Sequence, residues 1–479
     1  MYLLPRTTFF LIFLYISCAF PLPTASEHST DNIYGTRSIW SIIWSCLSII
    51  SACTWIAVHP NIPGPKDSKW TVLCKRMKIM GCFIFAPGIV LGWAAKQHWA
   101  ARLTVKRYHR EHGWTMAHGF FIGMGGFTLH DQTGKAVRIL DSEGLEKLYN
   151  EGKVAWPSIT EEEIEDRSNG DHLSKGFVLV QMSWFIIQFI LRAAYGLAVT
   201  LFEVQTLSFA IISGATYYLW WHKPLDVRCS VPVYLLPPLN QDPQSPISEE
   251  IQNPQQSFIL PNHNYCSSSI VHNHNDREPN SSSTSVSNST RVRRLPAFIQ
   301  RHRQKHGILV RLAEVFIHDS LLEFLEAVGE ISSSITHHPS PESPPRVPTF
   351  YSPWDPRDTN QRQFFIIRVS FPICIAAVLG GIHCIAWSFQ FPSPQEQLAW
   401  RISAAFITAE PILFGLLIHL DKCQVTILSI CIKALFISLS VMYFVARILL
   451  LILPCITLRA LPPSALIEIQ WTSLIPHIS

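Results

Sequence analysis

Residues 38–58 read SIWSIIWSCLSIISACTWIAV, a run of 21 residues without one charged side chain. About 20 consecutive apolar residues are enough for a helix to cross the hydrocarbon core of a bilayer, so this run predicts a membrane-spanning helix. Trp40 and Trp55 stand near its two ends, where indole rings favour the membrane–water interface. The run therefore indicates an integral membrane protein, and the apolar stretches around it decide the fold.

The composition of the 479 residues agrees with this class. Hydrophobic residues make up 48% and charged residues only 15%, whereas soluble domains carry about 25% charged residues. The net charge is +4, and the basic residues are spread among polar segments, which argues against nucleic-acid binding. Most of the twelve cysteines lie in apolar stretches and none forms a C-x-x-C pair, so we interpret them as small packing residues.

Six further apolar stretches predict spans at 77–95, 176–197, 200–221, 364–387, 400–420 and 427–453. The spans at 176–197 and 200–221 must form a tight helical hairpin, because only two residues separate them. The span at 77–95 contains Pro87-Gly88, which a membrane helix tolerates because neighbouring helices satisfy the freed backbone groups. Residues 114–129 (WTMAHGFFIGMGGFTL) are apolar but short, so we expect a re-entrant or interfacial segment, with a short span as the alternative. The predicted fold class is an all-α polytopic bundle of about 6–7 transmembrane helices, divided into bundles at 27–228 and 364–479.

The N-terminus predicts a signal peptide over residues 1–26. Arg6 precedes an apolar run of 14 residues, and small residues follow up to Ala25 and Ser26, where we expect cleavage. An uncleaved anchor helix is the alternative. Either one directs the chain to the secretory pathway, so we expect a multi-pass protein of the endoplasmic reticulum or plasma membrane.

The segment 229–363 separates the two bundles. Its first part is rich in Pro, Gln, Asn and Ser, and such a composition predicts a disordered loop. Two sequons make Asn280 and Asn288 candidate glycosylation sites. Residues 308–328 form an amphipathic helical pattern after a basic run, and we expect this helix to lie on the cytosolic leaflet or to pack against the bundle or a second chain. The loop is the expected site for a cytosolic protein partner, and the oligomeric state stays open.

The charge distribution gives conflicting topologies. The arginine-rich 222–363 should be cytosolic and the arginine-poor loop at 390–399 should lie outside. A cleaved signal peptide then requires that 114–129 also cross, which would place Lys96, Arg102, Lys106, Arg107 and Arg110 outside against the rule. The other solution is that the apolar run within residues 1–26 is not cleaved but stays as a span, with the N-terminus of the chain outside.

Ionisable residues inside apolar spans are the candidate functional positions, because they are costly there. Glu203 lies one turn into the fourth span, and Arg192 lies across the tight turn, so the two form a natural pair. This pair would stabilise the hairpin, with a substrate or ion contact or a plain interfacial position as alternatives. Glu410-Pro411 interrupts the sixth span. Its expected partners are Arg368, Lys433, Arg447, His383 and His419.

The sequence gives little support for an enzyme. His109, His112 and His118 fall close together, but the histidine clusters of membrane di-iron enzymes are missing, as are G-x-S-x-G, Walker A and H-E-x-x-H motifs. We therefore predict no metal, no cofactor and no catalytic residue.

Several stretches together resemble a family of uncharacterised multi-pass membrane proteins of filamentous fungi. They are Gly35-Thr36-Arg37 and residues 44–63, 161–176, 200–210, 220–227 and 458–479. The resemblance implies a shared membrane core and a fungal source, and it includes Glu203 and the stretch from Lys223 to Asp226 without giving them a role. Our leading hypothesis is a transport-like protein in the bilayer. A sensor or scaffold that recruits partners through the loop is the second, and a membrane-embedded enzyme the third.

Overall fold

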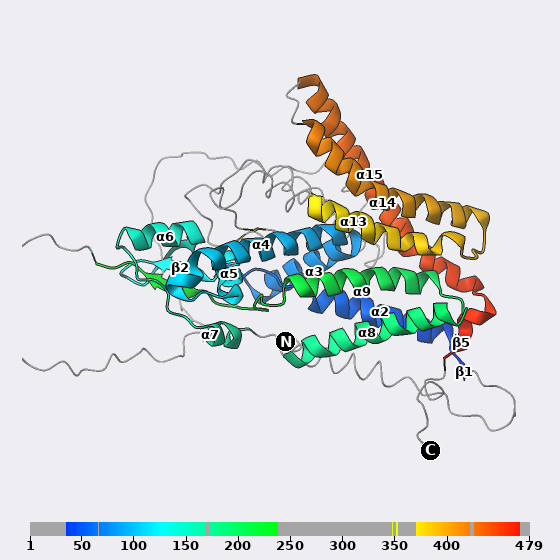
Figure 1. The fold of residues 1–479 in the computed structure, drawn as a ribbon, viewed down its shortest axis with the longest axis horizontal. Helices are drawn as coiled ribbons and strands as arrows, with labels where there is room; N and C mark the ends of the chain where they lie inside the picture. Colours follow the sequence, from blue (N-terminus) through cyan, green and yellow to red (C-terminus); the bar gives the residue numbers. More distant parts are fainter. Residues whose placement is uncertain are drawn as a thin grey trace, which may run out of the picture. The chain divides into compact units, whose positions relative to one another are not determined.

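The computed structural model describes residues 35–65, 67–168, 172–237, 347, 351–352, 370–421 and 426–469. These residues are mostly helical, as expected for a polytopic membrane protein, and they belong to one unit of the chain (Figure 1). The predicted all-α class is too narrow, because the unit also contains a two-stranded and a three-stranded sheet. The signal peptide, most of the predicted loop, both sequons and the amphipathic helix at 308–328 lie outside the described residues. The start of the predicted loop is described, and Val231–Tyr234 form a strand there, which corrects the expectation of disorder for these residues.

Five long helices come from the first half of the chain: α2 (Ile39–Ile56), α3 (Lys69–Phe85), α4 (Pro87–His112), α8 (His172–Ala194) and α9 (Leu201–Leu219). The second half supplies α13 (Phe371–Gly381), the 3₁₀ helix η3 (Ile382–Ser388), α14 (Pro394–Asp421) and α15 (Thr426–Thr457), followed by η4 (Leu458–Ala460) and η5 (Pro463–Leu466). By length and apolar character, α2, α8, α14 and α15 are candidate membrane spans, and the bent pair α3–α4 is a fifth candidate. The described residues thus hold four or five candidate spans, fewer than the six or seven predicted. Helices α9 and α13 lie at the remaining predicted positions but do not meet this criterion.

Helix α9 is the central element of the bundle. It contacts α2, α4, α8, α13, α15 and η3, and its polar side chains Gln205, Thr206, Ser208 and Ser213 are all buried. A helix with so many polar groups would be unfavourable against lipid, but other protein segments surround this one. By contrast, α8, α14 and α15 expose apolar side chains such as Val180, Ile402 and Ile437, as helices in contact with lipid do.

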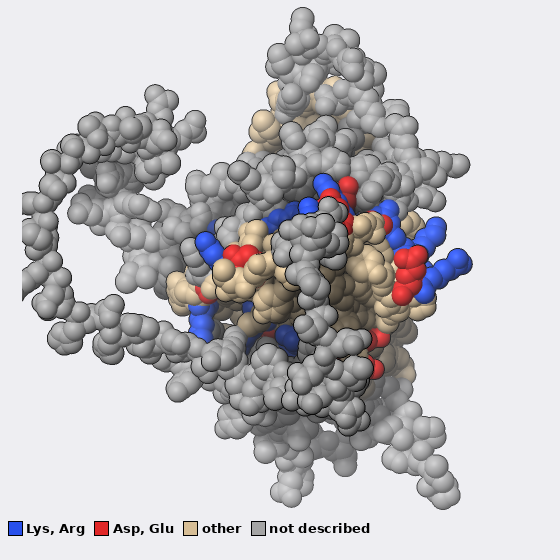
Figure 2. Space-filling model, turned by 90° about the vertical axis from the view of Figure 1, so that its left-hand side faces the viewer, with Lys and Arg blue, Asp and Glu red and all other residues tan. Residues whose placement is uncertain are grey.

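The bundle has two ends, which we name by what lies there. At the tail end, β1 (Gly35–Thr36) before α2 pairs antiparallel with β5 (Ile467–Glu468) after η5. At the domain end, a small α/β domain contains α5 (Met116–Gly123), β2 (Phe127–His130), β3 (Ala136–Leu140), α6 (Ser142–Asn150), α7 (Glu161–Asp166) and β4 (Val231–Tyr234). Figure 2 looks onto the domain end, where Lys and Arg side chains lie among Asp and Glu.

The α/β domain corrects our expectation for residues 114–129. They form α5 and the central strand of a sheet with the order β3-β2-β4, in which β2 is antiparallel to β3 and parallel to β4. Phe127 and Leu129 are buried while the alternate residues are less so, and they share an apolar core with Leu140 and Val233. The apolar character of this segment thus comes from the core of a folded domain, which a glycine-rich sequence of 16 residues does not distinguish from a membrane segment.

The helix breaks inside the predicted span at 77–95, so that this segment is a broken span or a re-entrant loop. Helix α3 ends at Phe85, Ala86 leaves the helical conformation, and α4 starts with Pro87, so that the two axes differ by 113°. Proline is favourable at the first position of a helix, where its missing N–H leaves no bond unmade. Pro87 therefore starts a new helix and does not merely kink an existing one. Thr160 and Glu163 have the sequence spacing that predicts a capping box, and the structure confirms this box at the start of α7.

Candidate functional site in the bundle core

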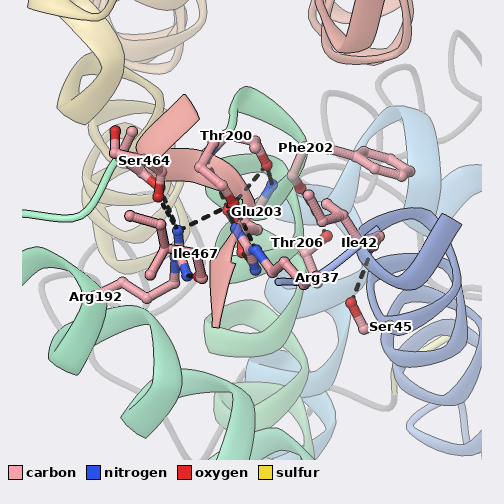
Figure 3. A network of polar contacts seen from close by, with 12 residues as sticks. Arg37, Ile42, Ser45, Arg192, Thr200, Phe202, Glu203, Thr206, Ser464 and Ile467 are labelled. Carbon is pink, nitrogen blue, oxygen red and sulfur yellow. Dashed lines mark hydrogen bonds and ion pairs between the residues drawn. The ribbon is translucent and has the colours of Figure 1, made fainter. Parts of the chain in front are cut away.

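Glu203 lies in the first turn of α9, at the tail end. Its N–H donates to Thr200 Oγ1 at 3.2 Å, and its Oε2 accepts from the Thr200 N–H at 2.8 Å and from the hydroxyl at 3.0 Å. The two residues thus form a capping box, which satisfies backbone donors at the helix start. Arg37 donates to both carboxylate oxygens, at 2.6 and 3.2 Å (Figure 3). Glu203 is only 5% exposed, and its carboxylate accepts four hydrogen bonds.

Arg192 lies beside this group but does not pair with Glu203, which corrects our expectation. Its guanidinium donates to the carbonyls of Ile467 at 2.7 Å, Ala198 at 2.8 Å, Ser464 at 3.1 Å and Ala465 at 3.2 Å. Arg37 Nε donates to the Ala465 carbonyl as well, at 2.6 Å. The pairing of β1 with β5 brings Arg37 to Glu203 from 166 positions away. No local pattern in the sequence could have revealed this partner.

A second polar group lies deeper in the bundle and joins α9, η3 and α15. His383 Nε2 is 3.0 Å from Gln205 Oε1 and 3.2 Å from Arg447 Nη1. Because a guanidinium only donates, His383 Nε2 accepts, and Nδ1 then carries the proton toward the Gly380 carbonyl 3.2 Å away. An accepting Nε2 requires that the Gln205 amide turn its NH2 group, and not its oxygen, toward His383. Arg447 Nε donates to the Ile84 carbonyl at 3.1 Å. Among the described residues, Arg447 Nη2 is buried without a hydrogen-bond partner.

Glu410 is the second buried glutamate, in the part of α14 that qualifies as a candidate span. Its side chain is 4% exposed, and within the described part of the chain it has neither a hydrogen bond nor an ion pair. Of its expected partners, Arg447 and His383 bond to other groups. Arg368 and the side chains of Lys433 and His419 lie outside the described part. Glu410 therefore differs from Glu203 in having no described cation beside it.

The backbone next to Glu410 is unusual too. Pro411 lies inside α14 and has no N–H to donate to the carbonyl of Ile407. Gly380 of α13 packs directly against that carbonyl, since a Cβ at Gly380 would lie 2.7 Å from the Ile407 oxygen. Ile407 and Glu410 are three positions apart and hence neighbours on the helix surface. One short stretch of α14 thus presents a carboxyl group and a carbonyl that lacks its helical donor.

Lys223 forms a third polar group, at the domain end beyond α9. Its ammonium donates to the His59 carbonyl at 2.5 Å, Gln97 Oε1 at 2.8 Å and Asn61 Oδ1 at 3.2 Å. It also lies 4.9 Å from the ring centre of Trp93 and 4.8 Å from that of Trp220. Burial lowers the pKa of Lys223 below 10.5, whereas three oxygen acceptors and two indole faces favour the charged form. The contacts of Lys223 join the segment after α2 to α4 and to the end of α9.

The three clustered histidines bind protein groups. His118 Nδ1 accepts from the Thr115 N–H at 3.2 Å while Nε2 lies 2.9 Å from the Ile159 carbonyl. His109 Nδ1 is 3.0 Å from the Trp114 carbonyl, and the His112 ring stacks on Trp156 at 3.8 Å between centres. In the described part of the chain, no three potential metal ligands come together. These histidines therefore serve the packing of the α/β domain.

Comparison with known proteins gives a family of unknown function. Residues 6–235 match a family model whose description reads "Family of unknown function (DUF8562)". This stretch covers the first bundle and the α/β domain, and it includes Arg37, Glu203 and Lys223 but not Glu410 or Arg447. No curated protein and no solved structure matches the chain.

Proposed function

We propose that this protein is transport-like and moves protons or a small monovalent cation across its membrane, with Glu410 as the group that binds them. The observation that carries the proposal is the burial of the Glu410 carboxyl in an apolar helix, without a partner among the described residues. An unpaired carboxylate is expensive in such surroundings, so the group is stable either with a proton or with a bound cation. Alternation between these two forms is the elementary step of proton- or cation-coupled transport.

The neighbourhood of Glu410 supports this role. The Ile407 carbonyl, which receives no bond from Pro411, is a second oxygen on the same face of α14. Transporters build cation sites from backbone carbonyls at helix irregularities together with carboxylates. Arg447 carries a buried donor without a described partner in the same bundle core, and such a donor offers a further polar position along a path. The described residues hold no comparable observation for a scaffold or an enzyme.

The test is flux through the purified full-length protein in liposomes. A potassium diffusion potential set with valinomycin drives cation entry, while a pH-sensitive dye inside the vesicles reports protons and a sodium-sensitive dye reports sodium. We expect entry of one of the two ions above the rate of protein-free vesicles, and Glu410→Gln should reduce it to that background rate. Glu396→Gln is the matched control, because Glu396 lies in the first turn of the same helix and pairs with Arg459 at the surface.

Two results would overturn the proposal. One is a wild-type protein that passes neither ion faster than empty vesicles. The other is a Glu410→Gln variant with the same flux as the wild type. A sodium flux without a proton flux would assign the site to the metal cation, and the reverse result would assign it to the proton.

A further inference from the structure

The path of α3 begins at the domain end of the bundle. Arg76 in α3 donates to both carboxylate oxygens of Asp226, at 3.0 and 2.9 Å, and Asp226 follows the last turn of α9. Arg76 Nη2 donates to the carbonyl of Trp55, in the last turn of α2, at 2.9 Å. The middle of α3 thus lies beside the ends of α2 and α9, and the first turns of α3 precede this point.

The C-terminal end of α3 lies within the bundle. The carbonyl of Ile84 accepts from Arg447 Nε, and Arg447 is ten residues before the end of the 32-residue α15. A Cβ at Gly88, just past the break, would lie 3.1 Å from Ala376 Cβ in the middle of α13. The break at Ala86 is therefore surrounded by the interior parts of two other helices. A buried guanidinium at this carbonyl is also favourable because it lies at the negative end of the α3 dipole.

Helix α4 then returns to the domain end. Gln97 Oε1 accepts from the Trp220 indole at 3.0 Å and from Lys223 at 2.8 Å, while His98 Nδ1 lies 2.8 Å from the Leu219 carbonyl. These partners mark the end of α9. Farther along, Tyr108 of α4 is part of the apolar core of the α/β domain. Both outer ends of the α3–α4 pair thus lie at the same end of the bundle (Figure 1).

The sheet at the tail end adds an independent constraint on the number of crossings. Gly35 pairs with Glu468 and Thr36 pairs with Ile467, so the chain before α2 and the chain after α15 are on one side of the membrane. Between them the chain must cross an even number of times. Among the described helices, α2, α8, α14 and α15 are candidate spans by length and apolar character. We count α9 and the shorter α13 with η3 as two more, which gives six crossings. A seventh crossing by α3–α4 would separate the paired strands.

We infer that α3 and α4 form a re-entrant hairpin, which enters the membrane from the domain end, turns at Ala86 beside Arg447, and leaves on the side it entered. The protein then has six crossings, and the tail end faces away from the cytosol. The α/β domain, both outer ends of the hairpin and the ends of the insert between β4 and α13 face the cytosol. This inference does not depend on the proposed transport function.

The re-entrant hairpin also removes the conflict between the charge rule and the signal peptide. A cleaved signal peptide places residue 35 outside, and α2 then brings the chain to the cytosolic side. Because α3–α4 does not cross, Lys96, Arg102, Lys106, Arg107 and Arg110 remain on that side, as the positive-inside rule requires. At the tail end, Arg37 pairs with Glu203 and Arg459 pairs with Glu396, which reduces the positive charge presented there.

The decisive experiment labels single cysteines on the two sides of the hairpin. Pro65→Cys precedes α3 and Glu111→Cys lies at the end of α4, both at exposed positions. Ser38→Cys, before α2, reports the opposite side. All three are made in a full-length chain in which the exposed described cysteines Cys229, Cys374 and Cys455 are replaced by serine. The labelling of this parent chain without a new cysteine is subtracted as background. A membrane-impermeant maleimide is applied to intact cells, and labelling is expressed as a fraction of that obtained after permeabilisation.

We expect Ser38→Cys to be labelled in intact cells, while Pro65→Cys and Glu111→Cys are labelled at least tenfold less until the membrane is permeabilised. Labelling of Pro65→Cys and Glu111→Cys from opposite sides would overturn the inference and make α3–α4 a broken span. A second measurement uses glycosylation. Trp471→Asn creates a sequon with Ser473 and should gain a glycan that endoglycosidase removes, whereas Asp131→Asn, which creates one with Thr133 in the exposed β2–β3 turn, should not. The reverse pattern would contradict the orientation.

Discussion

The two buried glutamates, Glu203 and Glu410, are equally shielded from solvent but have opposite surroundings. Glu203 accepts four hydrogen bonds from Thr200 and Arg37 at the tail end of the bundle. Glu410 lies in a candidate span without a described partner. A carboxylate that accepts several hydrogen bonds from the protein stabilises one arrangement of the chain. A carboxyl group without protein partners remains available to bind and release a proton or a cation. Burial alone therefore does not separate a structural glutamate from a functional one, but the partners do.

Loss of Glu203 should have the largest effect on stability. Glu203→Ala leaves the partly buried Arg37 without a carboxylate and removes the cap of α9, so we expect destabilisation by about 3–5 kcal/mol. Thermal unfolding of the detergent-solubilised protein, followed by the loss of its monodisperse chromatographic peak, measures the change. Glu203→Gln keeps an oxygen for the Thr200 N–H and should lie between the wild type and Glu203→Ala. Equal stability of Glu203→Ala and the wild type would contradict a structural role.

Lys223 extends the comparison to a buried cation. Lys223→Met takes the ammonium donor away from three oxygens, and we expect a loss of about 1–3 kcal/mol at neutral pH. Because burial lowers the pKa of Lys223, the unfolded chain binds more protons than the folded one, and wild-type stability gains from this group as pH rises toward 10.5. The methionine variant lacks this gain, so the difference between the two proteins should widen with pH.

The matched control for that series is Lys135→Met, since Lys135 is exposed in the β2–β3 turn. Its stability should follow the wild type at every pH. A difference between wild type and Lys223→Met that stays constant or narrows with pH would show that the Lys223 amine does not titrate as its burial implies.

The two capping boxes allow a smaller test of the same principle. Thr200→Ala removes a cap inside the bundle, and Thr160→Ala removes the equivalent cap of the exposed α7. Cap losses are typically about 0.5–2 kcal/mol. We expect Thr200→Ala near the upper value and Thr160→Ala near the lower, measured by the same melting assay, because only the Thr200 hydroxyl also donates to a buried ion pair. The opposite order would argue against Glu203 as a stabilising centre.

Glu410→Gln should have the smallest effect on stability even though it abolishes flux. No described partner loses a bond, so we expect a change within about 0.5 kcal/mol, or a slight stabilisation because an unpaired ionisable group is removed. A melting shift as large as that of Glu203→Ala would mean that Glu410 has a structural partner. The contrast between the two glutamates would then disappear.

Much of this architecture could be predicted from local sequence. Apolar length placed helices at 38–58, 176–197 and 427–453, and the spacing of Thr160 and Glu163 predicted their capping box. The errors arose where the outcome depends on distant residues. Residues 114–129 are apolar because Leu140 and Val233 cover them in a domain core, and β4, which completes that core, lies about 100 positions farther along the chain.

The candidate site was predictable only in part. Glu203, Arg192, Glu410 and Arg447 could be chosen because charges within apolar runs are conspicuous. Their partners could not, since Arg37 reaches Glu203 through the pairing of β1 with β5, and Arg192 bonds to backbone carbonyls that carry no side-chain signature. The break at Ala86 was visible as Pro87-Gly88. Whether it makes a kink or a return depends on Arg447 and Ala376, which are more than 280 positions away.

The closure of the tail end has a consequence for biosynthesis. Arg192 and Arg37 bond to carbonyls of residues 464–467, which the ribosome makes more than 270 residues after Arg192. Until then, both arginines are inserted without these acceptors, and strand β1 has no strand to pair with. Completion of the chain is thus coupled to completion of the fold. A chain stopped before residue 464 should be recognised as unassembled and degraded, and a pulse-chase experiment would show this as a half-life several-fold shorter than that of the full-length protein.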